Sequence, residues 1–266
     1  MDYQFLDVRR DGPVEHLMLN RPEVRNAFND VLVAELRHWT QAVTADAAVR
    51  VVVLGGRGPA FCAGADVEWM ARTASQTQEE NLRDATAAAD LFASLNAMPK
   101  AVIGRVHGAA LGGGAGLAAV CDIVVAGESA SFGFPEVRLG ILPAVVAPYV
   151  HAKIGTSLAR ELFLTGQRVP AQRARDIRLV HIVVPDADLD AHVDACVREL
   201  LGAAPTAIAA AKALLARLPS LELGETPSVT AGALAAQRAA PEGQEGLRAF
   251  LDKRLPNWHV PPHPDR

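Results

Sequence analysis

The fold is decided by one stretch near the middle of the chain, AVIGRVHGAALGGGAGLAAVCDIVV at residues 101–125. Residues 101–106 are mostly apolar and predict a buried strand. The glycine-rich residues 108–116 predict a turn followed by a short, alanine-rich helix, and residues 122–125 predict a second strand. Strands that alternate with helices in this way are typical of an α/β fold with a core sheet.

The same alternation extends in both directions from this stretch. Apolar spacing predicts helices at 27–43 and 79–95, and strands at 17–19 and 49–54. After Leu158 the pattern predicts helices almost throughout, and two of them are expected at 204–218 and 243–254. We therefore expect an α/β body followed by a helical C-terminal part.

Composition and charge narrow the class of protein. The chain has 266 residues, of which 50% are hydrophobic and 21% charged, so it can form a packed core. A net charge of −4 without a block of basic residues argues against nucleic acid as a partner. Three scattered cysteines, no leader-like N-terminus and no apolar run long enough for a bilayer predict a cytoplasmic protein that binds no membrane.

Several well-known catalytic motifs are absent from the sequence. It contains no GxxxxGK[ST], GxGxxG, GxSxG or HExxH pattern, which disfavours a P-loop enzyme, a dinucleotide-binding domain, an α/β-hydrolase and a zinc protease. The histidines are scattered and show no metal-ligand spacing. We expect neither a metal nor a separate cofactor.

Two glycine-rich segments remain as candidates for chemistry. FCAGAD at 61–66 and HGAALGGGAG at 107–116 each follow a predicted strand and precede a predicted helix. Such turns expose backbone N–H groups at a helix N-terminus, and two of them can point two donors at one oxygen. Alternatively, the glycines serve only the close packing of a helix on a strand.

These segments, with Cys121-Asp122 after them, resemble the enoyl-CoA hydratase/isomerase (crotonase) family. Asn20-Arg21-Pro22 with Asn26-Ala27 and the FLDKR sequence at 250–254 are similar to that family as well. The resemblance implies a crotonase-like α/β spiral of ββα units over 1–200 and a helical trimerisation region over 201–266. It also implies a homotrimer or a dimer of trimers.

The resemblance assigns the oxyanion hole to two backbone N–H groups, those of Ala65 and Gly113. They would hold the thioester carbonyl of an acyl-CoA and stabilise the enolate formed during reaction. Coenzyme A is then part of the substrate.

The resemblance also implies substrate contacts outside the oxyanion hole. Ala63 would receive the adenine end of coenzyme A, while Asp66 and Val67 would frame the pantetheine through their backbone. Phe250 would line the acyl pocket of a neighbouring subunit, and Lys253 would reach the phosphates there. An exposed helix-end lysine is the alternative reading of Lys253.

Hydratases of this family carry two glutamates, and this chain matches one of them. Glu136 stands at the position of the second glutamate, whereas Gly116 stands at the position of the first. A single carboxylate can still transfer a proton where apolar surroundings raise its pKa. The alternative for Glu136 is an ordinary surface position in a loop.

The sequence thus predicts a hydratase-type lyase that acts on an enoyl-CoA. A single glutamate also suits a Δ3/Δ2 enoyl-CoA isomerase, and the missing glutamate is compatible with a non-catalytic acyl-CoA binder. The segments at 66–70, 114–117 and 136–150 resemble bacterial methylglutaconyl-CoA hydratases of leucine breakdown. That substrate would need a cation or clustered N–H donors for its distal carboxylate, and the candidate cations are Arg72, Arg83, Arg138, His151 and Lys153.

Overall fold

A six-stranded sheet runs through the body of the molecule. The structure is a computed structural model and describes residues 3–259. The strands follow the order β1-β2-β3-β4-β6-β9, and all neighbours are parallel except β1 and β2. They comprise β1 (Leu6–Asp11), β2 (Val14–Leu19), β3 (Val51–Gly56), β4 (Ala101–Val106), β6 (Ile123–Gly127) and β9 (Ile182–Val184).

A second, smaller sheet has the order β5-β7-β8. Its strands are β5 (Ala109–Leu111), β7 (Ser131–Gly133) and β8 (Arg168–Pro170). β5 follows directly on β4, and β7 follows directly on β6, so the chain passes from the first sheet to the second twice. Helix α4 (Gly113–Val120) then leads from the second sheet back to the first. This repeated path is a spiral of strand–strand–helix units.

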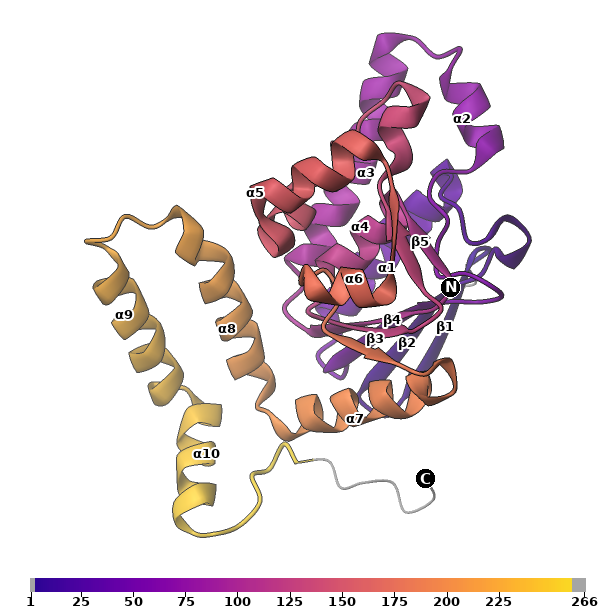
Figure 1. Cartoon of the computed structure of the whole chain (residues 1–266). Coiled ribbons are helices and arrows are strands. Elements are labelled where there is room, and N and C mark those ends of the chain that lie inside the picture. The colour runs from indigo at the N-terminus through magenta and orange to yellow at the C-terminus, as the bar shows by residue number, and fades with distance from the viewer. Residues whose placement is uncertain (1–2, 260–266) are drawn as a thin grey trace.

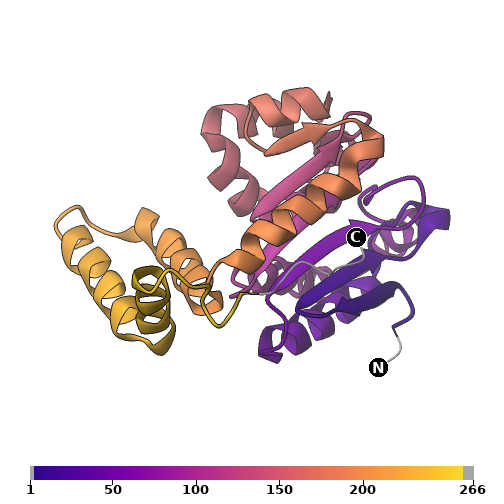
Figure 2. The same cartoon turned by 90° about the horizontal axis from the view of Figure 1, so that it is seen from below.

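Helices cover both faces of the large sheet (Figures 1 and 2). One face packs against α7, whose Leu189 and Val193 join Val51, Ile103 and Val125 in one apolar cluster. The other face carries the main core, in which α1 and α3 pack together and α4 packs on α5. The helices of the body are α1 (Asp30–Ala45), α2 (Val67–Thr73), α3 (Gln78–Asn96), α5 (Ala147–Thr165), α6 (Ala171–Asp176) and α7 (Leu189–Gly202).

Four short 3-10 helices complete the body and its junctions. They are η1 (Pro22–Val24), η2 (Pro135–Leu139), η3 (Asp186–Asp188) and η4 (Leu218–Ser220). η2 matters most for the site, because it carries Glu136.

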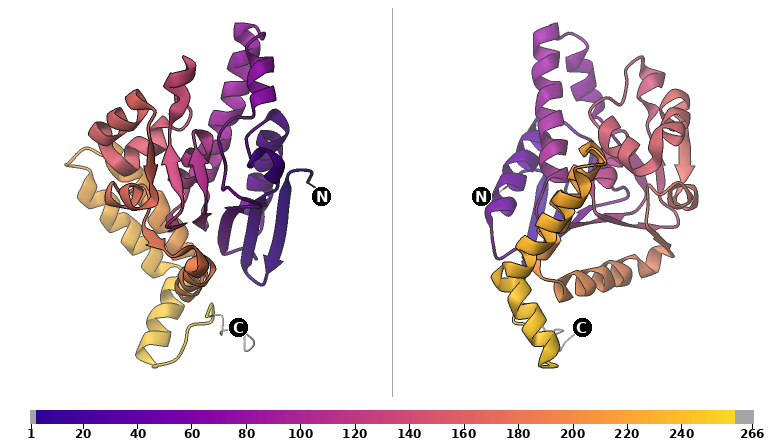
Figure 3. Two further views of the ribbon diagram at one scale, coloured as in Figure 1. Left: turned by 45° about the vertical axis from the view of Figure 1, so that its right-hand side comes forward. Right: turned by 90° about the vertical axis from the view of Figure 1, so that its left-hand side faces the viewer.

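The last three helices form an arm that extends from the body (Figures 1 and 3). They are α8 (Pro205–Arg217), α9 (Thr226–Ala239) and α10 (Pro241–Leu251). Within the single chain, no side chain of α8 or α9 is fully buried, although several are half-buried. An ion pair of 2.6 Å between Lys212 and Asp122 joins the arm to the body. The arm therefore has apolar surface that its own chain does not cover.

Among residues 3–259, no single helix combines the length and apolar character needed to cross a bilayer. One bent pair, Asp186–Gly202 with Pro205–Ser220, meets both criteria on length and composition alone, with 100° between its halves. In the first half, Leu189, Val193 and Val197 pack against the sheet.

Most of the sequence-based elements agree with the structure. β4 has the predicted bounds, and the helix predicted at 79–95 is α3, which begins with a capping box formed by Thr77 and Glu80. The chain after Leu158 is mostly helical, as predicted, but the two short strands β8 and β9 were not foreseen. Each has only three residues, too few for an alternating pattern to distinguish it from a helix.

One buried side chain ties the N-terminal loop to the segment that precedes the first glycine turn. Asn26 accepts a hydrogen bond of 2.8 Å from the N–H of Arg21 and donates to the carbonyl groups of Arg57 and Ala60, both at 2.8 Å. It is completely buried, and its φ of 58° lies in the left-handed region that asparagine tolerates. The Asn20-Arg21-Pro22…Asn26-Ala27 motif is therefore a structural clamp.

Replacement of Asn26 by alanine should destabilise the protein strongly. The change leaves one backbone N–H and two carbonyl groups without partners, at roughly 1–3 kcal/mol for each buried group. Asn20→Ala is the matched control, since Asn20 is exposed in the same loop. We expect thermal unfolding to show a large fall in Tm for Asn26→Ala and almost none for Asn20→Ala; equal shifts would contradict the clamp.

Candidate active site

A cavity of about 170 Å³ brings three of the predicted site residues together. Ala65, Gly113 and Glu136 all line it. The rest of the wall is apolar or aromatic and consists of Phe28, Val33, Trp69, Ala88, Phe92, Leu142, Pro143, Ala144, Val145 and Val146. Within residues 3–259, Glu136 is the one acidic or basic side chain in this wall.

Ala65 lies in a turn whose neighbours make the hydrogen bonds. Phe28 forms a parallel bridge opposite Ala65, in which its N–H donates to Gly64 at 2.7 Å and its carbonyl accepts from Asp66 at 2.8 Å. In a parallel pair these two bonds leave the N–H of the central residue on the opposite side. The N–H of Ala65 therefore points away from Phe28.

Gly113 is the first residue of α4, where a backbone N–H has no partner inside the helix. Gly112 before it has a φ of 52° and donates to the carbonyl of Gly133 at 2.8 Å, which fixes the entry into the helix. In the part of the chain that the structure describes, neither Gly113 nor Ala65 uses its N–H in a hydrogen bond within the protein. Both donors are available to a ligand in the cavity.

A short bridge holds the two glycine turns side by side. The N–H of Cys62 donates to Ala109 at 3.0 Å, and the N–H of Leu111 donates to Cys62 at 2.9 Å. A Cβ on Gly114 would lie 2.2 Å from the carbonyl oxygen of Cys62, so this approach requires glycine. Close packing, the alternative explanation for the glycines, therefore applies to Gly114. The same packing positions the backbone N–H groups of Ala65 and Gly113.

Glu136 lies beside the second turn. Its Oε1 would be 2.7 Å from a Cβ built on Gly112, and its Oε2 is buried without a hydrogen-bond partner among residues 3–259. Burial raises the pKa of the Glu136 carboxyl, and a hydrogen bond from its own backbone N–H offsets part of this rise. A raised pKa brings a carboxyl closer to the range in which it can both accept and release a proton.

Gly116, which stands at the position of the family's first glutamate, has no space for a side chain. A Cβ there would lie 2.2 Å from Cγ1 of Val146 and 3.2 Å from Cε1 of Phe92. Both neighbours belong to the cavity wall. An apolar contact therefore occupies the place where a second acid would stand.

Asp66 fixes the first turn through its carboxylate. It accepts hydrogen bonds from the N–H groups of Glu68 and Trp69 at the start of α2, and it pairs with buried Arg21 at 2.8 Å. Burial alone would raise the pKa of Asp66, but the hydrogen bonds from Arg21 and the two N–H groups outweigh it and hold this pKa below its usual value. Sequence reasoning missed this ion pair, although both residues lie in the motifs that were recognised.

The remaining predicted substrate contacts lie outside the cavity wall. Ala63 donates its N–H to the carbonyl of Arg25, and Val67 is 75% exposed. Phe250 is 81% exposed near the end of α10, and the N–H of Lys253 donates to its carbonyl at 3.2 Å. α10 lies on the arm, apart from the elements around the cavity (Figure 1). The structure of one chain does not bring these two residues to the cavity.

None of the five candidate cations lies in the cavity wall. Four of them have partners elsewhere: Arg72 pairs with Asp30, Arg138 donates to Thr165, His151 contacts Thr156, and Lys153 donates to the carbonyl of Cys121. Arg83 is exposed on α3. A distal carboxylate would find no cation of this chain in the wall described above.

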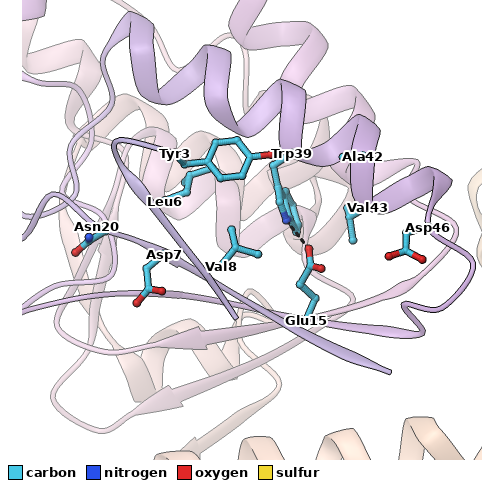
Figure 4. Close-up of a pocket in the computed structure, with 10 residues that line it drawn as sticks. All are labelled: Tyr3, Leu6, Asp7, Val8, Glu15, Asn20, Trp39, Ala42, Val43 and Asp46. Carbon is cyan, nitrogen blue, oxygen red and sulfur yellow. Dashed lines mark hydrogen bonds between the residues drawn. The ribbon is translucent and has the colours of Figure 1, made fainter. Parts of the chain in front are cut away.

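A larger hollow of about 600 Å³ lies elsewhere, between α1 and the first two strands (Figure 4). Its acids are engaged: Glu15 accepts from Trp39 at 2.6 Å, Glu15 and Asp46 both pair with Arg10, and Asp7 pairs with Arg57. Among the described residues, no group of three His, Cys, Asp or Glu side chains could hold a metal ion. The smaller cavity is therefore the candidate active site.

Comparisons with known proteins show the family and the fold of the chain. The family model described as enoyl-CoA hydratase/isomerase matches residues 9–261. The 2,3-dehydroadipyl-CoA hydratase of Escherichia coli is 34% identical, over 95% of this chain and 98% of its own. Two solved structures superpose closely: an enoyl-CoA hydratase from Shewanella pealeana (TM-score 0.93, 36% identity, 96% of each chain) and Pseudomonas aeruginosa AtuE (TM-score 0.93, 40% identity, 97% of this chain and 100% of the other).

The spiral of ββα units is thus a crotonase fold, as the sequence predicted. The chain belongs to the enoyl-CoA hydratase/isomerase family.

The raised pKa of Glu136 predicts a pH-dependent effect on stability. The folded state favours the protonated carboxyl. The stability that this protonation contributes is fully present below the ordinary carboxyl pKa and is lost as pH rises through the folded-state pKa. Glu136→Gln removes the buried charge, so we expect its Tm to exceed that of the wild type at pH 8 and the two values to converge near pH 4. Glu23→Gln, at an exposed glutamate, is the control; a Tm difference for Glu136→Gln that does not vary with pH would contradict the burial effect.

Proposed function

We propose that this protein adds and removes water across the α,β double bond of an enoyl-CoA thioester. The observation that carries the proposal is the single cavity lined by Ala65, Gly113 and Glu136. It combines two backbone donors that make no other hydrogen bond in the described chain with one carboxyl of raised pKa. These groups are what a reaction through an enolate needs.

The two backbone donors bind the thioester oxygen. When water adds to the β carbon, negative charge moves onto this oxygen, and the N–H groups of Ala65 and Gly113 stabilise the enolate. The dipole of α4 acts in the same direction, since Gly113 is at its N-terminus. A donor of this kind contributes about 3 kcal/mol to lowering the barrier.

Glu136 transfers one proton in two steps. Its carboxylate takes a proton from water while the water oxygen bonds to the β carbon, and the resulting carboxylic acid gives that proton to the α carbon of the enolate. One face of the double bond receives both groups, so the addition is syn. Since the wall holds no second acid or base within the described residues, one carboxyl performs both steps.

The single carboxyl also supports a second candidate, Δ3/Δ2 isomerisation. In that reaction Glu136 removes a proton from the α carbon and returns it to the γ carbon, and no water is required. The apolar wall suits such a reaction. The absorbance of the conjugated enoyl thioester distinguishes the two, because a hydratase removes it from crotonyl-CoA whereas an isomerase creates it from a Δ3 substrate.

The apolar wall bears on the acyl group. Methylglutaconyl-CoA, the ester suggested by sequence resemblance, has a distal carboxylate, and leaving that charge unpaired in an apolar site is costly. We propose a short, uncharged enoyl group as the better substrate.

We further propose self-association as a homotrimer or dimer of trimers, in which Phe250 and Lys253 of one chain contact the substrate in the cavity of the next. The uncovered apolar surface of the arm supports this arrangement.

Glu136→Gln should abolish most of the activity and leave binding intact. Removal of a general acid–base group lowers kcat by about 10²–10⁴-fold. We expect this loss with crotonyl-CoA in a spectrophotometric assay, while calorimetry shows unchanged affinity for the saturated analogue butyryl-CoA. If the wild type binds butyryl-CoA but converts neither crotonyl-CoA nor a Δ3-enoyl-CoA, the protein is a non-catalytic binder and the proposal fails.

Gly113→Pro tests one backbone donor directly. Proline is accepted at the first position of a helix and removes the N–H. Gly113→Ala is the matched control, because it keeps the N–H and places a similar Cβ 3.0 Å from the ring of Phe28. Relative to Gly113→Ala, we expect Gly113→Pro to lose about 10²–10³-fold more in kcat. Equal activity of the two variants would exclude this N–H from catalysis.

A further inference from the structure

One part of the cavity wall is formed by a contact between Val146 and helix α4. Val146 immediately precedes α5 and is 3% exposed, and it packs against Gly116 of α4. Gly116 lies three residues beyond Gly113, so the two occupy neighbouring positions on one face of α4. Val146 therefore lies in the same cavity wall as the Gly113 donor.

This contact is complementary in shape. A Cβ on Gly116 would lie 2.2 Å from Cγ1 and 2.8 Å from Cβ of Val146, so even alanine is excluded while the valine is present. Conversely, Gly116 has no side chain that could move into the space of Val146. If Val146 is made smaller, the space that it leaves joins the cavity and is not filled from α4.

The aromatic side chains near this contact are held by packing against one another. The ring of Phe92 stacks on that of Tyr149 with centroids 6.2 Å apart, and it also lies 6.2 Å from the ring of Phe28. All three rings pack with the main core. Val146 takes no part in these ring contacts, so its size can change without breaking them.

We propose that Val146 is a specificity-determining residue, which packs on Gly116, takes up volume in the cavity wall and so restricts the acyl group to short chains. The inference rests on the proposed function and names the feature that selects among enoyl-CoA substrates. One methylene more or less in a hydrophobic pocket changes specificity by about 10–200-fold, so one valine is sufficient for strong selection.

The test compares Val146→Ala with Val150→Ala. Val150 lies one turn further along α5, is completely buried in the same core and does not line the cavity. The readout is the ratio of kcat/KM for trans-2-octenoyl-CoA to that for crotonyl-CoA. We expect Val146→Ala to raise this ratio at least about tenfold and Val150→Ala to leave it unchanged. An unchanged ratio in Val146→Ala, or an equal rise in both variants, overturns the inference.

Two further variants keep the test decisive if Val146→Ala folds poorly. Val146→Ile retains the wall and should lower the ratio. Gly116→Ala should be damaging alone and less damaging together with Val146→Ala, since the contact with Cγ1 at 2.2 Å is lost and only that with Cβ at 2.8 Å remains; the double variant should lower the ratio again towards that of the wild type. Additive losses in the double variant would contradict the packing argument.

Binding separates this inference from the proposed function. Calorimetry with saturated butyryl-CoA and octanoyl-CoA requires no turnover, and we expect Val146→Ala to gain affinity for the longer ester relative to the wild type. If the wild type binds neither ester and converts no enoyl-CoA, the proposed function itself fails, and this inference with it. If the wild type is active and Val146→Ala changes neither ratio nor affinity, only the role of Val146 is refuted.

Discussion

Two hydrogen bonds between distant parts of the chain hold the site together. They link Cys62 with Ala109 at 3.0 Å and with Leu111 at 2.9 Å, and they place one glycine turn against the other. The donors of Ala65 and Gly113 face a common cavity because of this bridge. Side chains could not perform the same task as well, since a backbone N–H in a fixed turn needs no reorganisation when charge develops.

The residues around the bridge fix its position and determine which groups line the cavity. Asn26 clamps the approach to the first turn, and the buried pair of Arg21 with Asp66 fixes its exit. The rest of the cavity wall is apolar or aromatic, so few other polar groups compete with the carboxyl of Glu136. The result is a cavity with two backbone donors that have no protein partner among the described residues, one buried carboxyl and an otherwise apolar wall.

Much of this arrangement follows from local sequence, and part of it does not. The strand at 101–106 and the glycine turns are encoded by neighbouring residues, and their order identified the family. The strands β8 and β9 were missed, because three residues pair with a sheet only through contacts distant in sequence. The fit of Val146 on Gly116 was missed for the same reason: a glycine indicates that space is short, but not which residue fills it. The single chain also leaves the roles of Phe250 and Lys253 as predictions, since they depend on a neighbour.

The central claim is that two main-chain donors meet at one thioester oxygen. A crystal structure of the protein with butyryl-CoA, a saturated ester that cannot be hydrated, tests it most directly. The account predicts a thioester oxygen at about 2.7–3.1 Å from the backbone nitrogens of both Ala65 and Gly113, with the α and β carbons next to Glu136. A thioester oxygen that contacts only one of these nitrogens, or an acyl group bound outside the cavity, would contradict it.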